Sequence, residues 1–198
     1  MREHFDDPYV KKSREQGLRS RAVFKLQEIH ERDHLFKPGM TVVDLGAAPG
    51  SWSEAAAELV EPGGKVIASD ILPLDTLAGV QFIQGDFTDN EVYQQILAAL
   101  GDTGADLVIS DMAPNLSGMK DIDQPRMLHL AELALELAST ALKPGGSLLV
   151  KVFQGAGLAE YQRELQSSFR SVKVRKPRAS RARSAELYLL AEGFMAAQ

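Results

Sequence analysis

From residue 40 onward, short apolar runs alternate with stretches whose apolar residues recur at helical spacing. Such alternation is typical of a parallel sheet covered by helices on both faces. The pattern predicts five strands in this part of the chain, at Thr41–Leu45, Lys65–Ser69, Val80–Gln84, Asp106–Ser110 and Ser147–Phe153. The helices predicted between them are Ser51–Val60, Glu91–Leu100 and Gln124–Leu142.

The C-terminal part continues with a predicted helix at Leu158–Phe169, a strand at Ser171–Arg175 and a last strand near Leu187–Ala191. The connection between these two strands is too short for a crossover helix, so we expect the last strand to run antiparallel to its neighbours. An amphipathic helix is predicted before the first strand, at Arg19–Asp33. The sequence therefore predicts an α/β fold with a seven-stranded, mostly parallel sheet and helices on both faces.

Two Pro-Gly-Gly tripeptides punctuate this pattern, at residues 62–64 and 144–146. Each follows a helical stretch and precedes a strand, so both are expected to stop a helix and form a turn. No repeat, linker or low-complexity segment divides the 198 residues, and this length suits one domain. We expect a single domain, in which a basic, helical extension at 1–37 precedes a catalytic core at 38–198.

The composition excludes several classes of protein. Hydrophobic residues make up 44% and charged residues 25%, as in an ordinary globular domain. No apolar run reaches the ~20 residues of a membrane span, and the N-terminus is too polar for a signal peptide. Without cysteine there is no disulfide or thiol nucleophile, and the four histidines have no metal-ligand spacing. We expect a cytoplasmic monomer that binds no metal.

The charge distribution says more than the net charge of −5. Residues 11–25 contain six Lys or Arg and one acid, and residues 170–183 contain seven Lys or Arg and no acid. Two concentrated basic segments in an otherwise acidic chain indicate a polyanionic partner. Two solvated basic faces without a ligand are the alternative.

The strongest chemical signal is the segment VVDLGAAPGSW at residues 42–52. A strand here enters a small-residue loop and then a helix, where open α/β sheets bind nucleotide-like ligands. Gly46 and Gly50 allow the backbone to approach such a ligand closely. Asp70 ends the second strand, where an acid can accept ribose hydroxyls, and Asp86 follows the third strand, where it suits an adenine amino group.

Neither the dinucleotide motif GxGxxG nor the triphosphate motif GxxxxGK[ST] is present. An adenosine ligand that lacks phosphates and carries a sulfonium and an amino-acid tail fits this acid-rich edge better. The sequence therefore predicts S-adenosylmethionine as the cofactor. A glycine loop that serves only turning and packing is the alternative.

A second candidate cluster begins with Lys151, which interrupts an apolar run that reads as a central strand. A lysine there is costly unless it is paired or lies at the sheet edge, and a lysine extending past the strand end is the alternative. Asp111 ends the preceding strand at the same edge. An antiparallel last strand would bring Glu186 toward both, although an ordinary surface acid is equally consistent. For Lys25, periodicity alone predicts an exposed helical lysine.

The chain resembles the FtsJ/RrmJ (RlmE) family of bacterial RNA 2′-O-methyltransferases over nearly its whole length. The resemblance implies the Rossmann-like fold of class I S-adenosylmethionine-dependent methyltransferases. The matching segments are GLRSRA at 17–22, FKL at 24–26, TVVDLGAAPG at 41–50, QGDF at 84–87, SDMAPN at 110–115, VKVFQG at 150–155 and SRARS at 180–184 with Glu186.

The resemblance also implies site residues. The family's catalytic tetrad falls on Lys25, Asp111, Lys151 and Glu186. Its methyl-donor contacts fall on Gly50, Trp52, Asp70, Asp86 and Asp111. The implied reaction is methylation of the ribose 2′-hydroxyl of a uridine in the A loop of 23S rRNA, within the 50S subunit, and it involves neither DNA nor a membrane.

In this reaction the 2′-oxygen attacks the sulfonium methyl group in line. Because a hydroxyl is a poor nucleophile at neutral pH, Lys151 is expected either to accept its proton as a neutral amine or to orient its oxygen as an ammonium. Lys25 would favour the neutral form of Lys151, whereas Asp111 and Glu186 would favour the charged form.

Three other functions remain open at this stage. A 2′-O-methyltransferase acting on tRNA or another RNA would use the same tetrad. A small-molecule methyltransferase would not require two basic segments. A non-catalytic rRNA-binding assembly factor would not require Lys151 within an apolar strand.

Overall fold

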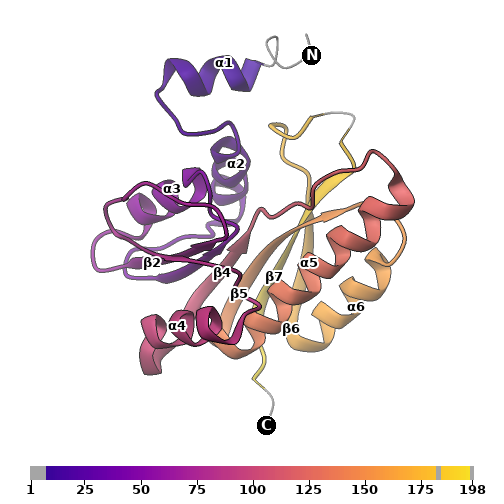
Figure 1. The fold of residues 1–198 in the computed structure, drawn as a ribbon. Coiled ribbons are helices and arrows are strands. Elements are labelled where there is room, and N and C mark those ends of the chain that lie inside the picture. The colour runs from indigo at the N-terminus through magenta and orange to yellow at the C-terminus, as the bar shows by residue number, and fades with distance from the viewer. Residues whose placement is uncertain (1–7, 182–183, 197–198) are drawn as a thin grey trace.

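The computed structural model describes residues 8–181 and 184–196 of the chain (Figure 1). Within these residues a single mixed sheet forms the centre of the molecule, in the order β3-β2-β1-β4-β5-β7-β6. Arg183 of the second basic segment and His4 lie outside the described residues. The strands are β1 (Thr41–Leu45), β2 (Lys65–Asp70), β3 (Val80–Gln84), β4 (Ala105–Ser110), β5 (Leu142–Phe153), β6 (Phe169–Arg175) and β7 (Glu186–Phe194).

The direction of the strands agrees with the sequence prediction. The pairs β1–β2, β2–β3, β1–β4 and β4–β5 are parallel, whereas β7 is antiparallel to both β5 and β6. The prediction of a seven-stranded, mostly parallel sheet with an antiparallel last strand is confirmed for the described residues.

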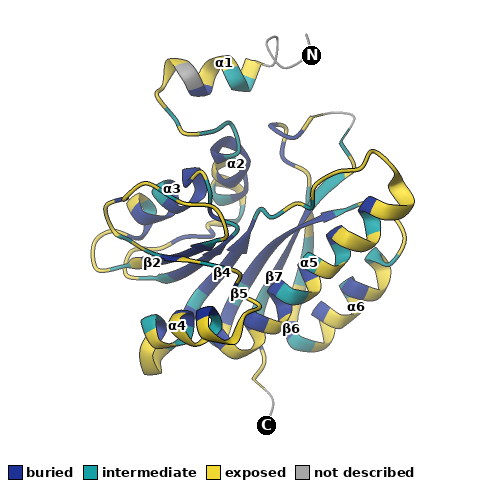
Figure 2. Ribbon diagram, in the orientation of Figure 1, coloured by how far each residue is buried: buried dark blue, intermediate teal, exposed yellow. Residues whose placement is uncertain are grey.

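Helices cover both faces of the sheet, because neighbouring strand residues point in opposite directions. On one face, Val43 and Leu45 of β1 pack with residues of the last three helices, α4, α5 and α6. On the other face, Val42 packs with residues of α2 and α3. Figure 2 shows β1, β2, β4, β5 and β7 buried along most of their length, whereas the edge strands β3 and β6 are mostly half-buried or exposed. The helices are α1 (Pro8–Glu15), α2 (Val23–Asp33), α3 (Ser51–Val60), α4 (Asn90–Leu100), α5 (Lys120–Ala141) and α6 (Leu158–Ser168), with a short 3₁₀ turn at Gly101–Thr103.

The N-terminal part differs from the prediction. Helix α1 was not predicted, and α2 begins at Val23 rather than Arg19. Just before α2, the hydroxyl of Ser20 accepts a hydrogen bond from the backbone N–H of Ala22. Such a local side-chain bond favours a turn over a helix, which accounts for the later start.

Two boundaries of the following segment were also predicted wrongly. Helix α5 begins at Lys120, one turn before the predicted Gln124, and the buried carboxylate of Asp123 accepts hydrogen bonds from the backbone N–H groups of Ser117 and Gly118. The second Pro-Gly-Gly lies inside β5 rather than between a helix and a strand. The pairing of β4 with β5 shifts register there, so the strand absorbs the tripeptide as an irregularity.

Among the described residues, no helix combines the length and apolar character that crossing a membrane requires.

Candidate active site

The candidate catalytic residues meet at the edge of the sheet where the parallel strands end. Asp111 directly follows β4, and Lys151 lies near the end of the neighbouring β5. In the antiparallel β5–β7 pair, Phe153 faces Glu186 and Lys151 faces Tyr188. The direction of the last strand therefore places Glu186 beside Lys151, as the sequence predicted.

Lys151 is 6% exposed, and its side chain is held by Asp111. Its Nζ atom donates to the backbone oxygen of Asp111 at 2.5 Å and to the carboxylate Oδ1 at 3.0 Å. Burial of an ammonium is tolerated when such partners compensate the lost hydration. Lys151 is thus the paired lysine at the sheet edge rather than one that extends past the strand end.

Lys25 completes the cluster from helix α2. Its Nζ atom forms an ion pair with Oε1 of Glu186 and lies 4.0 Å from Oδ1 of Asp111. The residue is 6% exposed, so the prediction of an exposed lysine from helical periodicity alone is wrong. Lys25 can be buried because Glu186, which compensates its charge, comes from β7, far away in sequence.

Tyr188 also belongs to this cluster, and the sequence analysis missed it. Its hydroxyl lies 2.5 Å from Oδ1 of Asp111 and 2.9 Å from Oε1 of Glu186, so it can donate its proton to either carboxylate. Burial, together with the negative charges of both acids, raises the pKa of Tyr188 well above its ordinary value. Strand alternation was the available signal, since a residue two positions after Glu186 points to the same face.

The carboxylate of Glu186 stays ionised although it is largely buried. Burial raises its pKa, but the nearby charges of Lys25 and Lys151 and the hydrogen bonds from Lys25 and Tyr188 outweigh that effect. The net result is a pKa of Glu186 below its ordinary value. The cluster therefore holds opposite charges in contact.

Positive charge also lies near the cluster. Burial and the charge of Arg181 lower the pKa of the Arg21 guanidinium, whereas the charges of Glu186 and Asp111 raise it. Arg21 belongs to the first basic segment and Arg181 to the second. The fold thus brings part of each basic segment to the same edge of the sheet.

The candidate cofactor residues surround the loop between β1 and α3. The carboxylate of Asp70 accepts hydrogen bonds from the backbone N–H groups of Ala48 (2.9 Å) and Leu72 (2.8 Å), and so joins this loop to the end of β2. Asp86 follows β3 and is exposed, and its Oδ1 accepts hydrogen bonds from Thr88. The side chains of Ile71 and Leu72, beside Asp70, are 66% and 58% exposed.

The two glycines of the loop have backbone conformations that other residues rarely adopt. Gly46 has φ +74° and Gly50 has φ +100°. A Cβ atom on Gly46 would lie 2.3 Å from Cγ of Met112, and one on Gly50 would lie 2.7 Å from a methyl carbon of Leu74. The loop is therefore closely packed, and side chains at these positions would fill its approach to the sheet edge.

Trp52 points away from this edge into the core. Its ring is 3% exposed, its Nε1–H donates to the backbone oxygen of Ala22 at 2.8 Å, and it packs on Tyr188 with ring centroids 5.7 Å apart. The side chain thus connects α2 and α3 to β7. Any contact of Trp52 with a ligand at the loop would involve its backbone.

Asp44 lies beneath the loop and is almost fully buried. Its Oδ2 accepts a hydrogen bond of 2.6 Å from the hydroxyl of Ser53. Burial raises the pKa of Asp44 to about 7, against the opposing effect of the Ser53 bond, and the charges of Asp111 and Asp70 raise it further. This acid connects β1 to α3 on either side of the glycine loop.

The residues at this edge fit S-adenosylmethionine. Acids at the ends of successive strands suit hydroxyl and amino groups, and exposed apolar side chains beside Asp70 suit a base. In the part of the chain that the structure describes, no group of three or more His, Asp or Glu could hold a metal ion.

Comparison with known proteins agrees with this geometry. A family model described as FtsJ-like methyltransferase matches residues 18–194. The chain is 62% identical, over 98% of its length and 92% of the relative's, to ribosomal RNA large subunit methyltransferase E of Chromohalobacter salexigens. It is 56% identical, over its full length and 94% of the relative's, to the protein of that name from Cellvibrio japonicus.

A solved structure is also similar. A Plasmodium falciparum protein described as a ribosomal RNA methyltransferase superposes with a TM-score of 0.81 at 27% identity, and the match covers 90% of this chain and all of that one.

Proposed function

The chain belongs to the FtsJ-like methyltransferase family, and from this premise we propose that it methylates large-subunit ribosomal RNA. The methyl donor is S-adenosylmethionine. The acceptor is the ribose 2′-hydroxyl of a uridine in the A loop of 23S rRNA, within the 50S subunit. The observation that carries the proposal is the buried cluster in which Lys151 is held by Asp111 and faced by the Lys25–Glu186 ion pair.

Lys151 acts on the substrate hydroxyl. Its nitrogen already makes two contacts with Asp111, which leaves one of its three positions for the 2′-hydroxyl. As a neutral amine it would accept the hydroxyl proton through its lone pair. As an ammonium it would donate its third N–H to the oxygen and orient the lone pair that attacks, and the hydroxyl proton would then leave to solvent.

Lys25, Glu186 and Tyr188 set the charge and geometry around Lys151. The Lys25–Glu186 pair and the Tyr188 hydroxyl fix the two acids, so that Asp111 holds Lys151 in one position. Holding the reacting oxygen at near-attack distance can supply a large part of the rate enhancement without any change of protonation.

S-adenosylmethionine, when bound, supplies an electrophilic methyl group on a sulfonium. We propose that Asp70 accepts its ribose hydroxyls, Asp86 its adenine amino group, and Asp111 contacts it from the catalytic side. Gly46 and Gly50 allow the loop to approach it. Because Trp52 directs its ring inward, we propose that its contact comes from its backbone N–H in the first turn of α3, where N–H groups lack helical partners.

The basic residues position the RNA. Arg21 lies close enough to Arg181, Glu186 and Asp111 for their charges to shift its pKa, and phosphate contacts at such positions fix register without reading sequence. We propose a single domain in which the extension at 1–37 contributes Lys25 and RNA contacts to the core at 38–198. The enzyme would act as a monomer in the cytoplasm, on assembled large subunits.

The test is transfer of labelled methyl groups to unmodified 50S subunits, with tRNA and free rRNA assayed in parallel. We expect label in the 50S subunit, as one 2′-O-methyluridine in the A loop. Label in tRNA alone would keep the chemistry and overturn the substrate. Absence of label despite measured S-adenosylmethionine binding would favour a non-catalytic assembly factor.

A further inference from the structure

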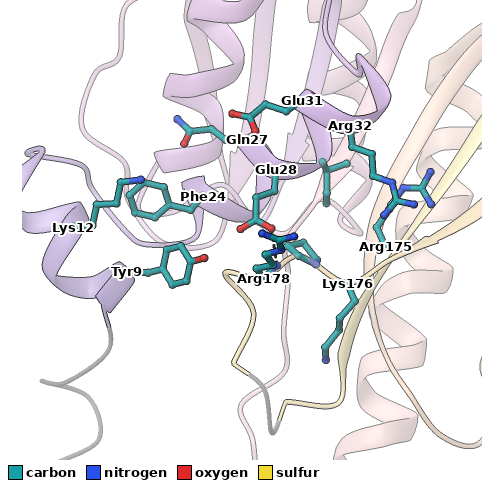
Figure 3. A pocket seen from close by; sticks show the side chains of 12 residues that line it. Tyr9, Lys12, Phe24, Gln27, Glu28, Glu31, Arg32, Arg175, Lys176 and Arg178 are labelled. Atoms are coloured by element: carbon teal, nitrogen blue, oxygen red, sulfur yellow. Dashed lines mark hydrogen bonds between the residues drawn. The ribbon is translucent and has the colours of Figure 1, made fainter.

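A groove with a volume of about 500 Å³ lies along α2. It is bounded by α1, by the outer face of α2 and by the segment that follows β6 (Figure 3). Figure 3 shows Tyr9 and Lys12 on one side of the groove, Arg32 and Arg175 on the other, and Glu28 between them. The proposed reaction assigns no role to this groove.

Basic side chains outnumber acidic ones in the groove, since five Lys or Arg and two Glu, Glu28 and Glu31, line it. The Glu28 carboxylate accepts hydrogen bonds from the backbone N–H groups of Arg178 (2.6 Å) and Ala179 (2.9 Å). Asp33 does not line the groove, but it forms a two-pronged pair with Arg175, which does, with both N–O distances at 2.6 Å. Bidentate pairing of this kind fixes both partners. The exposed side chain of Arg178 therefore projects from a backbone that Glu28 holds in place.

The opposite wall is aromatic as well as basic. The Tyr9 ring packs on Phe24 with centroids 5.6 Å apart. The Nζ atom of Lys12 lies 4.8 Å from the centroid of Phe24, within the range of a cation–π contact. The ring and the lysine of α1 thus have defined positions on the helix that carries Lys25. Aromatic faces combined with a basic groove are the features that bind single-stranded nucleic acid.

The groove and the catalytic cluster both involve residues of α2. Phe24 and Lys25 are adjacent on α2, one facing the groove and the other facing Glu186. On the other wall, Nζ of Lys176 donates to the backbone oxygens of Ser184 (2.5 Å) and Glu186 (2.7 Å). A strand leaving the catalytic residues along α2 would enter the groove directly.

We propose that this groove binds a single-stranded segment of the RNA substrate next to the nucleotide that is methylated. Lys12 and Arg178 contact its phosphates, and a base stacks on Tyr9. The inference rests on the proposed function for the identity of the RNA. The existence of an RNA-binding site does not depend on the proposed function, because it is argued only from the charge and shape of the groove.

The experiment measures binding of a fluorescent single-stranded RNA of about 12 nucleotides, a length typical of such sites. Its affinity is followed by anisotropy over a range of salt concentrations. Lys12→Ala and Arg178→Ala are each expected to reduce the slope of log affinity against log salt by about 0.7, the value for one lost phosphate contact on a single strand. Tyr9→Leu is expected to weaken binding about tenfold with an unchanged slope, whereas Tyr9→Phe keeps wild-type affinity.

Lys11→Ala is the matched control, since Lys11 is the neighbouring lysine on the same helix. Its side chain is 79% exposed and pairs with Glu15 instead of lining the groove. This variant should keep the wild-type slope. With 50S subunits and S-adenosylmethionine, the groove variants should raise KM and leave kcat unchanged.

The outcomes separate the two proposals. If Lys12→Ala, Arg178→Ala and Tyr9→Leu bind the RNA like Lys11→Ala while methyl transfer proceeds, the groove proposal is overturned and the proposed function stands. If the binding pattern appears as expected but no RNA is methylated, the groove proposal stands and the proposed function fails.

Discussion

Asp111 holds the Nζ atom of Lys151 through both its main chain and its side chain, at 2.5 Å from the backbone oxygen and 3.0 Å from Oδ1. The peptide oxygen ties the lysine to the end of β4, and the carboxylate compensates its charge. One residue thus fixes the position and the electrostatic environment of the proposed catalytic amine. Because Asp111 contacts Lys151 through two different groups, we expect changing Lys151 and changing the Asp111 carboxylate to have different effects.

Changing Lys151→Met should abolish methyl transfer and spare cofactor binding. The variant keeps the volume of the side chain in the buried strand and removes only the amine. Turnover is expected to fall by at least about 10²-fold, the lower end of what a positioned acid or base contributes. The Kd for S-adenosylmethionine, measured by calorimetry, should stay close to wild type.

Lys143→Met is the control for this change. Lys143 also lies on β5, but it pairs with Asp106 at the opposite end of β4. This variant should keep full turnover. A Lys151→Met protein with substantial activity would remove Lys151 from the reaction.

Changing Asp111→Asn should damage both catalysis and cofactor binding. The amide cannot compensate the charge of Lys151, and it loses one acceptor facing the proposed cofactor. We expect the Kd for S-adenosylmethionine to rise about tenfold or more, as for a lost hydrogen bond involving a charged group. Asp106→Asn, at the other end of the same strand, should leave that Kd unchanged. An unaltered Kd for Asp111→Asn would exclude Asp111 from the cofactor site.

The central elements could be predicted because their patterns are local. The bounds of β1, β3 and α3 agree with the sequence prediction, since period-two and helical spacing decide them. Helix α1 was not predicted because it is mostly polar. Tertiary contacts with Phe24 hold it against α2.

The residues of the site could be predicted only in part, for the same reason. Lys151 could be singled out because a charged residue within an apolar run is conspicuous. Tyr188 lies in an apolar run where a tyrosine looks like ordinary core, and its role depends on acids that reach it from other elements. The burial of Lys25 depends on Glu186, which no local pattern connects to α2.

Changing Tyr188→Phe should lower both stability and turnover. Without the hydroxyl, the carboxylates of Asp111 and Glu186 lose a shared donor in a buried position, at a cost of about 1–3 kcal/mol. The midpoint temperature of thermal unfolding should then fall by about 2–4 °C for each kcal/mol lost. Tyr161→Phe is the matched control, because this equally buried hydroxyl donates to the backbone oxygen of Ala131. It should lose stability with unchanged kcat, and a Tyr188→Phe protein that behaves identically would assign Tyr188 to folding alone.

Changing Asp70→Asn should weaken binding of S-adenosylmethionine without abolishing it. Both carboxylate oxygens already hold the loop and the end of β2, and the amide keeps only one acceptor. We expect the Kd to rise about tenfold, in line with a lost hydrogen bond to a charged group. Asp75→Asn is the comparison, since the side chain of Asp75 is 89% exposed and pairs with Arg19. Equal affinities of the two variants would argue against Asp70 as a cofactor ligand.

Asp44 should make the stability of the protein fall as the pH rises toward neutrality. Its folded-state pKa of about 7 lies above its ordinary value of 3.8, because ionising it means placing a charge in the core. The stabilisation from its bound proton is therefore complete below pH 3.8, declines as the pH rises, and is lost above about 7. Asp44→Asn removes this dependence and keeps an acceptor for the hydroxyl of Ser53.

Urea unfolding of wild type and Asp44→Asn at pH 5, 6, 7 and 8 tests this expectation. The stability of the variant relative to wild type should increase by about 2 kcal/mol between pH 5 and 7 and then level off toward pH 8. Glu186→Gln provides the opposite sign at lower pH, because the lysines hold the pKa of Glu186 below its ordinary 4.5, so its stabilisation is present above pH 4.5 and is lost as the pH falls below that value. A constant difference between Asp44→Asn and wild type across this range would mean that Asp44 is already ionised at pH 5, with its charge compensated within the core.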